Sequence, residues 1–103
     1  MTVQTKEQFF ELLQQHEAAL HAFGVRRYGL FGSLVRNMHT ATSDVDVLVE
    51  FEPGQKTFDH FMNLAFFLEE LLGRPVDLIT TESLSPHIGP HILREVEYAT
   101  IGA

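Results

Sequence analysis

The sequence predicts a small α/β domain in which a twisted β-sheet packs against helices, and two observations carry this prediction. Segments rich in β-branched and aromatic residues alternate along the chain with segments whose apolar residues recur at helical spacing. With 103 residues, of which 45% are hydrophobic and 20% charged, the chain has the size and composition of one globular domain over residues 1–103. Helices and strands that alternate in this way form a sheet covered by helices.

The N-terminal third is predicted to form a helix and then a strand. Thr5 followed three residues later by Gln8 is typical of a capping box, and apolar residues then recur at helical spacing up to Gly24. We therefore expect a helix over about residues 5–22. Strand-favouring residues occupy 25–31 and run directly into a Gly-Ser pair, so a strand, a tight turn and a short helix should follow.

The remainder of the chain is predicted to contain two more strands and two more helices. A β-branched strand starts near residue 44 and reaches 51, and a helix covers 57–72 with Gly73 as its C-terminal cap. A short apolar strand follows at 75–79, and a last helix is expected within 85–95. The predicted order is α-β-α-β-α-β-α.

Charge and composition exclude several classes of function. Fourteen acidic residues stand against seven basic ones, the formal net charge is -7, and no run of Lys or Arg is present to follow a phosphate backbone. Direct nucleic-acid binding is therefore not expected. The chain has no cysteine and no apolar segment near the ~18 residues of a membrane span, so we expect a cytoplasmic protein without a membrane-bound part.

Three aspartates in predicted strands are the candidate metal ligands. Asp44 and Asp46 are separated by one residue, so the period of two in a strand places both carboxylates on one face. The two carboxylates of such a pair repel each other unless a cation binds between them, and Mg²⁺ prefers carboxylate oxygens as ligands. Asp77 is the one polar residue of its short strand and is expected across the sheet from the pair, which suits a two-metal transfer site. The alternative is that these acids only face solvent.

A candidate phosphate-binding turn precedes the acids. Gly32 and Ser33 come where a strand is predicted to turn into a helix, and free backbone N–H groups at such a place hold phosphate. The Ser33 hydroxyl can donate to the same phosphate, and Arg36, three residues further on, can assist. The alternative is an ordinary Gly-Ser turn.

The joint spacing resembles a known family. Gly32-Ser33, ten intervening residues, Asp44-x-Asp46 and then a lone strand aspartate, Asp77, are similar to the minimal nucleotidyltransferase (MNT) branch of the DNA polymerase beta superfamily. The likeness covers roughly residues 20–98, although Asn37 and Met38 stand where members often have Gly-Glu. It implies a nucleotidyltransferase-type mixed sheet. It also implies that Gly32 and Ser33 bind the triphosphate of ATP, while Asp44 and Asp46 are the metal ligands and Asp77 is the third acid.

The resemblance also implies a partner. MNT proteins are typically encoded beside HEPN-domain proteins in toxin–antitoxin pairs, which implies AMP transfer from ATP to a tyrosine of a HEPN toxin, two Mg²⁺ ions, and an antitoxin that forms a hetero-oligomer. Two alternatives to this interpretation remain open. In the first, the chain is a non-catalytic module that neutralises its toxin by contact alone. In the second, it is a nucleotidyltransferase that acts on a small-molecule acceptor, although the chain has little length left to form an acceptor pocket.

The predicted helix over 57–72 has more apolar residues than one narrow stripe holds. Leu64, Phe67 and Leu71 fall on a flank away from Phe58 and Met62 on a helical projection. We therefore expect either one wide core or a second apolar face that docks a partner.

Overall fold

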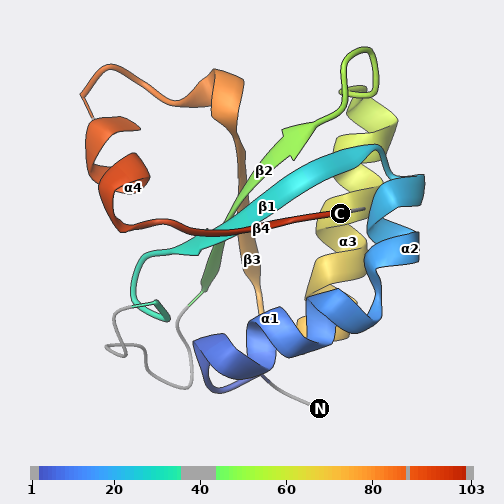
Figure 1. Ribbon diagram of the computed structural model, residues 1–103, viewed down its shortest axis with the longest axis horizontal. Coiled ribbons are helices and arrows are strands. Elements are labelled where there is room, and N and C mark those ends of the chain that lie inside the picture. Colours follow the sequence, from blue (N-terminus) through green and yellow to red (C-terminus); the bar gives the residue numbers. More distant parts are fainter. Residues whose placement is uncertain (1–2, 36–43, 88, 102–103) are drawn as a thin grey trace.

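A computed structural model describes residues 3–35, 44–87 and 89–101 of the chain. Helices and strands alternate along it as expected, and the predicted α/β fold is confirmed (Figure 1). In chain order the elements are α1 (Lys6–Gln15), α2 (Glu17–Ala22), β1 (Val25–Phe31), β2 (Val45–Phe51), α3 (Phe58–Leu72), β3 (Val76–Thr80), the 3₁₀ turn η1 (Thr81–Ser83), α4 (Gly89–Glu95) and β4 (Glu97–Thr100).

The four strands form one mixed sheet in the order β3-β2-β1-β4. Strand β1 pairs antiparallel with both β2 and β4, whereas β2 and β3 run parallel. The parallel pair is joined through α3, because parallel neighbours need a crossover connection. The mixed sheet that the family resemblance implies is therefore present.

Local capping chemistry sets the ends of the longest helix. The Thr57 hydroxyl accepts a hydrogen bond from the His60 N–H at 3.1 Å, and Gly73 ends α3 in the left-handed conformation with φ 69°. The same device begins α1, where Thr5 accepts from the Gln8 N–H at 3.1 Å. These ends were predictable because the caps depend on neighbouring residues. Across the described ranges, no helix combines the length and apolarity that crossing a membrane requires.

Four details differ from the predicted elements. The single helix expected over 5–22 is broken at His16, whose backbone is not helical (φ -117°, ψ 24°). The last helix begins at Gly89 rather than near residue 85. Residues 33–35 form a turn, and most of the short helix expected after Ser33 lies outside the described residues. Strand β4 was not predicted, because its four residues are both polar and apolar and show no clear alternation of the two. The segment is a strand because it pairs with the edge of β1.

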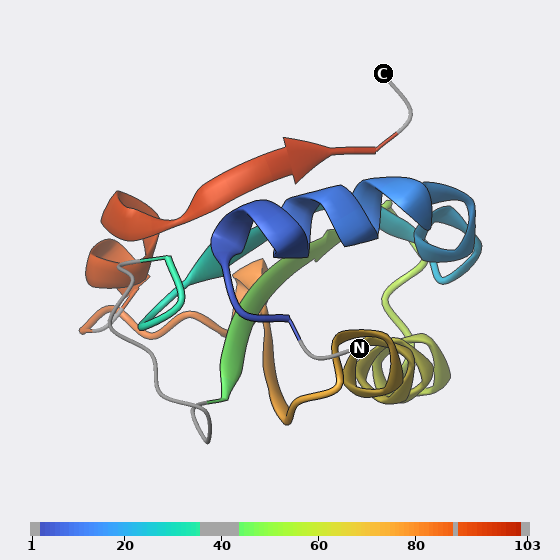
Figure 2. The same ribbon diagram turned by 90° about the horizontal axis from the view of Figure 1, so that it is seen from below.

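Apolar side chains cover both faces of the sheet. The larger core lies between the sheet and helices α1 to α3, which Figure 2 shows on one side, with α3 viewed nearly along its axis. On the opposite face, α4 packs over a smaller cluster formed by Phe31, Leu48 and Ile92, with Ile79, Leu84 and Val96 against it. Figure 1 shows α4 across the strands from α2 and α3. This second cluster places α4 on the face of β2 that carries Asp46, since Asp46 and Leu48 share a face.

The apolar flank of α3 packs largely against the larger core. Leu64 is buried in the larger core, and Phe67 and Leu71 pack against the same core. The ring of Phe67 lies 5.4 Å from that of Phe23, centroid to centroid. Of the two expectations for this flank, these contacts favour one wide core. Phe67 and Leu71 remain partly exposed, so a docking surface at these two residues stays a prediction.

Candidate nucleotide and metal site

Two of the predicted metal ligands are neighbours across the sheet. Asp46 of β2 is the register partner of Asp77 of the parallel strand β3. Adjacent strands lie ~4.8 Å apart and register partners project to the same face, so these two carboxylates share one small volume. Asp46 is half-buried and Asp77 is exposed. Asp44 is exposed and stands just before β2, two residues from Asp46, at the end of the strand where this pair lies.

The donor chemistry of the pair fits Mg²⁺. That ion is usually held by one or two carboxylates, with the substrate phosphates and water completing an octahedron. Within the described ranges, no group of three or more His, Cys, Asp or Glu side chains already has an arrangement that holds a metal ion. If Mg²⁺ binds here, Asp46 and Asp77 would supply two of its ligands and a triphosphate would supply others.

The Gly32 turn lies directly against this acid pair. Gly32 follows β1 with φ 79°, in the left-handed region that side chains rarely adopt. A Cβ atom at this position would overlap Oδ2 of Asp46. Only glycine therefore allows the turn and the Asp46 carboxylate to approach this closely, and the two predicted half-sites form a single site.

A fourth acid, Glu95, is part of this site and was missed by the sequence analysis. The Gly32 N–H donates a hydrogen bond to Oε1 of Glu95 at 2.7 Å. Glu95 ends α4, and 63 positions separate it from Gly32. No motif joins the two residues, so only the packing of α4 over the sheet could reveal the contact.

Of the remaining predicted residues, one is described and one is not. Ser33 is half-buried in the turn, and the next two residues, Leu34 and Val35, are buried and anchor that turn in the protein. Arg36, the predicted third contact for phosphate, lies outside the described residues.

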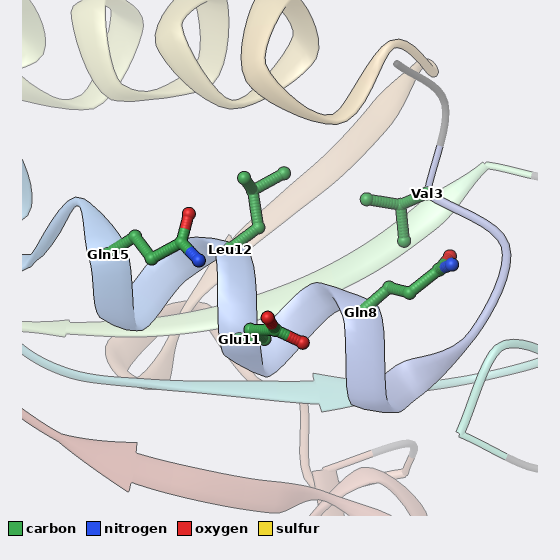
Figure 3. Close-up of a pocket in the computed structure, with 5 residues that line it drawn as sticks. All are labelled: Val3, Gln8, Glu11, Leu12 and Gln15. Carbon is green, nitrogen blue, oxygen red and sulfur yellow. The ribbon is translucent and has the colours of Figure 1, made fainter.

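The pocket drawn in Figure 3 is a separate feature. Val3 and one side of α1 line it with Gln8, Glu11, Leu12 and Gln15, around a volume of about 220 Å³. It contains none of the acids discussed above and no residue of the Gly32 turn. The candidate site is instead formed by the turn, the strand ends and the end of α4.

Comparisons with known proteins identify the family of the chain. Residues 9–101 match the nucleotidyltransferase domain family. The chain belongs to that family. The predicted resemblance to minimal nucleotidyltransferases and the prediction of a nucleotidyltransferase enzyme are therefore confirmed.

Individual relatives support the membership. The protein adenylyltransferase MntA of Thermococcus cleftensis is 42% identical over 99 residues, which cover 95% of this chain and 99% of the relative. A solved minimal nucleotidyltransferase superposes with a TM-score of 0.68 at 34% identity, covering 84% of this chain and 92% of the other. A toxin–antitoxin complex solved with AMP-PNP shares the nucleotidyltransferase fold, with a TM-score of 0.63 at 20% identity over 80% of this chain and 70% of the other.

Proposed function

We propose that this protein is a Mg²⁺-dependent protein adenylyltransferase that transfers AMP from ATP to a tyrosine of a HEPN-domain toxin and so acts as an antitoxin. The observation that carries the proposal is the single site formed by the Gly32 turn, Asp46 against it, and Asp77 beside Asp46. The 42% identity to the protein adenylyltransferase MntA supports the choice of a protein acceptor. The chain acts as one domain, residues 1–103, in the cytoplasm, with the toxin as its partner in a hetero-oligomer.

Each residue of the site has a part in the proposed reaction. Ser33, the Gly32 turn and Arg36 hold the triphosphate, and Asp44, Asp46 and Asp77 hold the metal. Two Mg²⁺ ions, when bound, would supply charge neutralisation on the phosphates and on the attacking oxygen. The acceptor hydroxyl oxygen forms a bond to the α-phosphorus, the bond from that phosphorus to pyrophosphate breaks, and the hydroxyl proton leaves to a base or to water.

The position of β3 suits an acceptor that arrives on another protein. Strand β3 is at one end of the strand order, and the carboxylate of Asp77 is exposed there. A tyrosine presented from the surface of a partner can therefore approach Asp77 from that edge without a pocket around it. A basic RNA-cleaving toxin would also be attracted by the net charge of -7.

Co-expression with the adjacent toxin should show that the partner is modified. The expected result is a toxin whose intact mass is raised by one or more AMP units, measured by mass spectrometry. Asp46→Asn should remove the added mass because it removes a metal ligand beside Asp77. Asp59→Asn, which neutralises an exposed acid at the start of α3, should leave it.

The same experiment separates the alternatives. A toxin that binds unmodified, and that the Asp46→Asn protein inhibits equally well, would establish the contact-only module instead. AMP transfer from labelled ATP to a small hydroxyl compound, with the toxin left unlabelled, would favour the small-molecule enzyme.

Ser33→Ala should weaken binding of Mg·ATP by about 1–3 kcal/mol, the usual range for a hydrogen bond to a charged group. The reason is the loss of the hydroxyl donor that follows the Gly32 turn. Calorimetric titration measures the change. Ser83→Ala, which removes a serine hydroxyl in η1 that bonds the Thr80 carbonyl, is the matched control and should bind as the wild type does. Equal affinity in the two variants would place the triphosphate elsewhere.

A further inference from the structure

We propose that Glu95 is a positioning residue of the nucleotide site. Its carboxylate holds the Gly32 turn from the side of α4, so that the Ser33 hydroxyl, rather than the Gly32 amide, is presented to the triphosphate. The role of the turn in binding nucleotide rests on the proposed function. The contact between Glu95 and Gly32 does not, because it is a feature of the fold.

The hydrogen bond between the Gly32 N–H and Glu95 is short for a bond donated by a backbone amide. The Gly32 N–H donates to a carboxylate oxygen at 2.7 Å, and hydrogen bonds to ionised acceptors are shorter and roughly twice as strong as neutral ones. Gly32 has φ 79° and little intrinsic preference for that conformation over others. A bond from outside the turn therefore selects one conformation of a flexible residue.

The backbone around Glu95 is anchored on both sides. Ile92, three residues earlier, is buried in the cluster beneath α4, and its carbonyl accepts from the Val96 N–H at 2.9 Å. Val96 packs where Gly29 of β1 has no side chain, since a Cβ on Gly29 would lie 2.5 Å from Cγ2 of Val96. Glu95 thus projects from a corner that cannot shift easily, which is the property expected of a residue that positions another.

The Gly32 amide already has an acceptor, which argues against a phosphate at that position. Its one N–H is donated to Glu95, and Asp46 lies against the other side of Gly32. A phosphate oxygen could bind this amide only by displacing the Glu95 carboxylate. No described residue forms a hydrogen bond with the Ser33 hydroxyl, so the turn binds the triphosphate through Ser33.

Four variants test the role of Glu95. Glu95→Ala removes the acceptor, Glu95→Gln keeps an acceptor oxygen without the charge, and Glu95→Asp keeps the charge but shortens the reach. Glu97→Ala is the control, because it removes a charge two residues away, where Glu97 pairs with Lys6 at 3.0 Å. The readouts are the Gly32 amide resonance with its hydrogen exchange, and the Kd of Mg·ATP by calorimetry.

We expect Glu95→Ala and Glu95→Asp to shift the Gly32 amide, speed its exchange and raise the Kd of Mg·ATP about tenfold, which is about 1.4 kcal/mol. Glu95→Gln should stay within about threefold of the wild type, and Glu97→Ala should match the wild type. An unshifted Gly32 amide in Glu95→Ala would overturn the proposal. Equal or tighter nucleotide binding by Glu95→Ala would also overturn it, because Glu95 would then compete with the triphosphate.

The two proposals fail in different ways. If the wild-type protein binds no Mg·ATP, the proposed function fails, while the Gly32 amide still reports whether Glu95 holds the turn. If the wild type binds Mg·ATP and Glu97→Ala weakens binding as much as Glu95→Ala, the loss does not depend on the contact with Gly32, and the positioning role is overturned.

Discussion

Replacing Asp44 and Asp46 together with asparagine is expected to abolish Mg²⁺-dependent nucleotide transfer while the fold remains. Asparagine has nearly the shape of aspartate but lacks the charge with which a carboxylate binds Mg²⁺. Loss of metal-centred stabilisation worth several kcal/mol would lower the rate by about a thousandfold or more. Transfer from labelled ATP to the toxin measures the effect. The double variant leaves only one acid of the three, Asp77, which is the register partner of position 46.

The stability of the same variant is a second, independent readout. In EDTA the carboxylates near Asp77 repel one another, so neutralising two of them should leave the melting temperature unchanged or raise it. Asp59→Asn, at an exposed position on α3, is the control and should keep full activity. Transfer by the double variant at a rate near that of the wild type would show that the metal site is elsewhere.

Gly32→Ala is expected to abolish transfer and also to destabilise the protein. The new Cβ would overlap Oδ2 of Asp46 and so push a proposed metal ligand away from Asp77. The φ of 79° adds backbone strain of about 1–3 kcal/mol. Gly32→Val should be more severe, because a branched side chain also obstructs the approach of phosphate. Thermal unfolding and transfer from labelled ATP measure the two effects separately.

Gly54→Ala separates strain from displacement of the acid. Gly54 has a nearly identical φ of 78°, but no atom of the described residues lies within 4 Å of the position its Cβ would take. This control should lose stability through strain alone and keep its activity. If Gly32→Ala and Gly54→Ala lose stability equally and both remain active, the Asp46 carboxylate does not need its place against Gly32, and the proposed geometry is wrong.

Local features were predictable from the sequence because their causes lie within a few residues. Strand β1 ends where the Gly-Ser turn begins, and α3 lies between Thr57 and Gly73 because those residues satisfy the free groups at its two ends. Asp46 lies on the face of β2 opposite to the buried Val45 and Val47, which follows from the period of two in any strand. Family membership followed from the same short motifs together with their separation along the chain.

Tertiary structure alone decided which distant residues meet. Asp77 was expected across the sheet from the acid pair, but only the parallel register of β3 on β2 makes Asp46 its direct neighbour. The apolar flank of α3 packs against the protein's own core, because the fold brings the ring of Phe23 against that of Phe67. Glu95 reaches Gly32 only because α4 packs over the small cluster on the acid-bearing face of the sheet, at a separation in sequence over which local spacing carries no information.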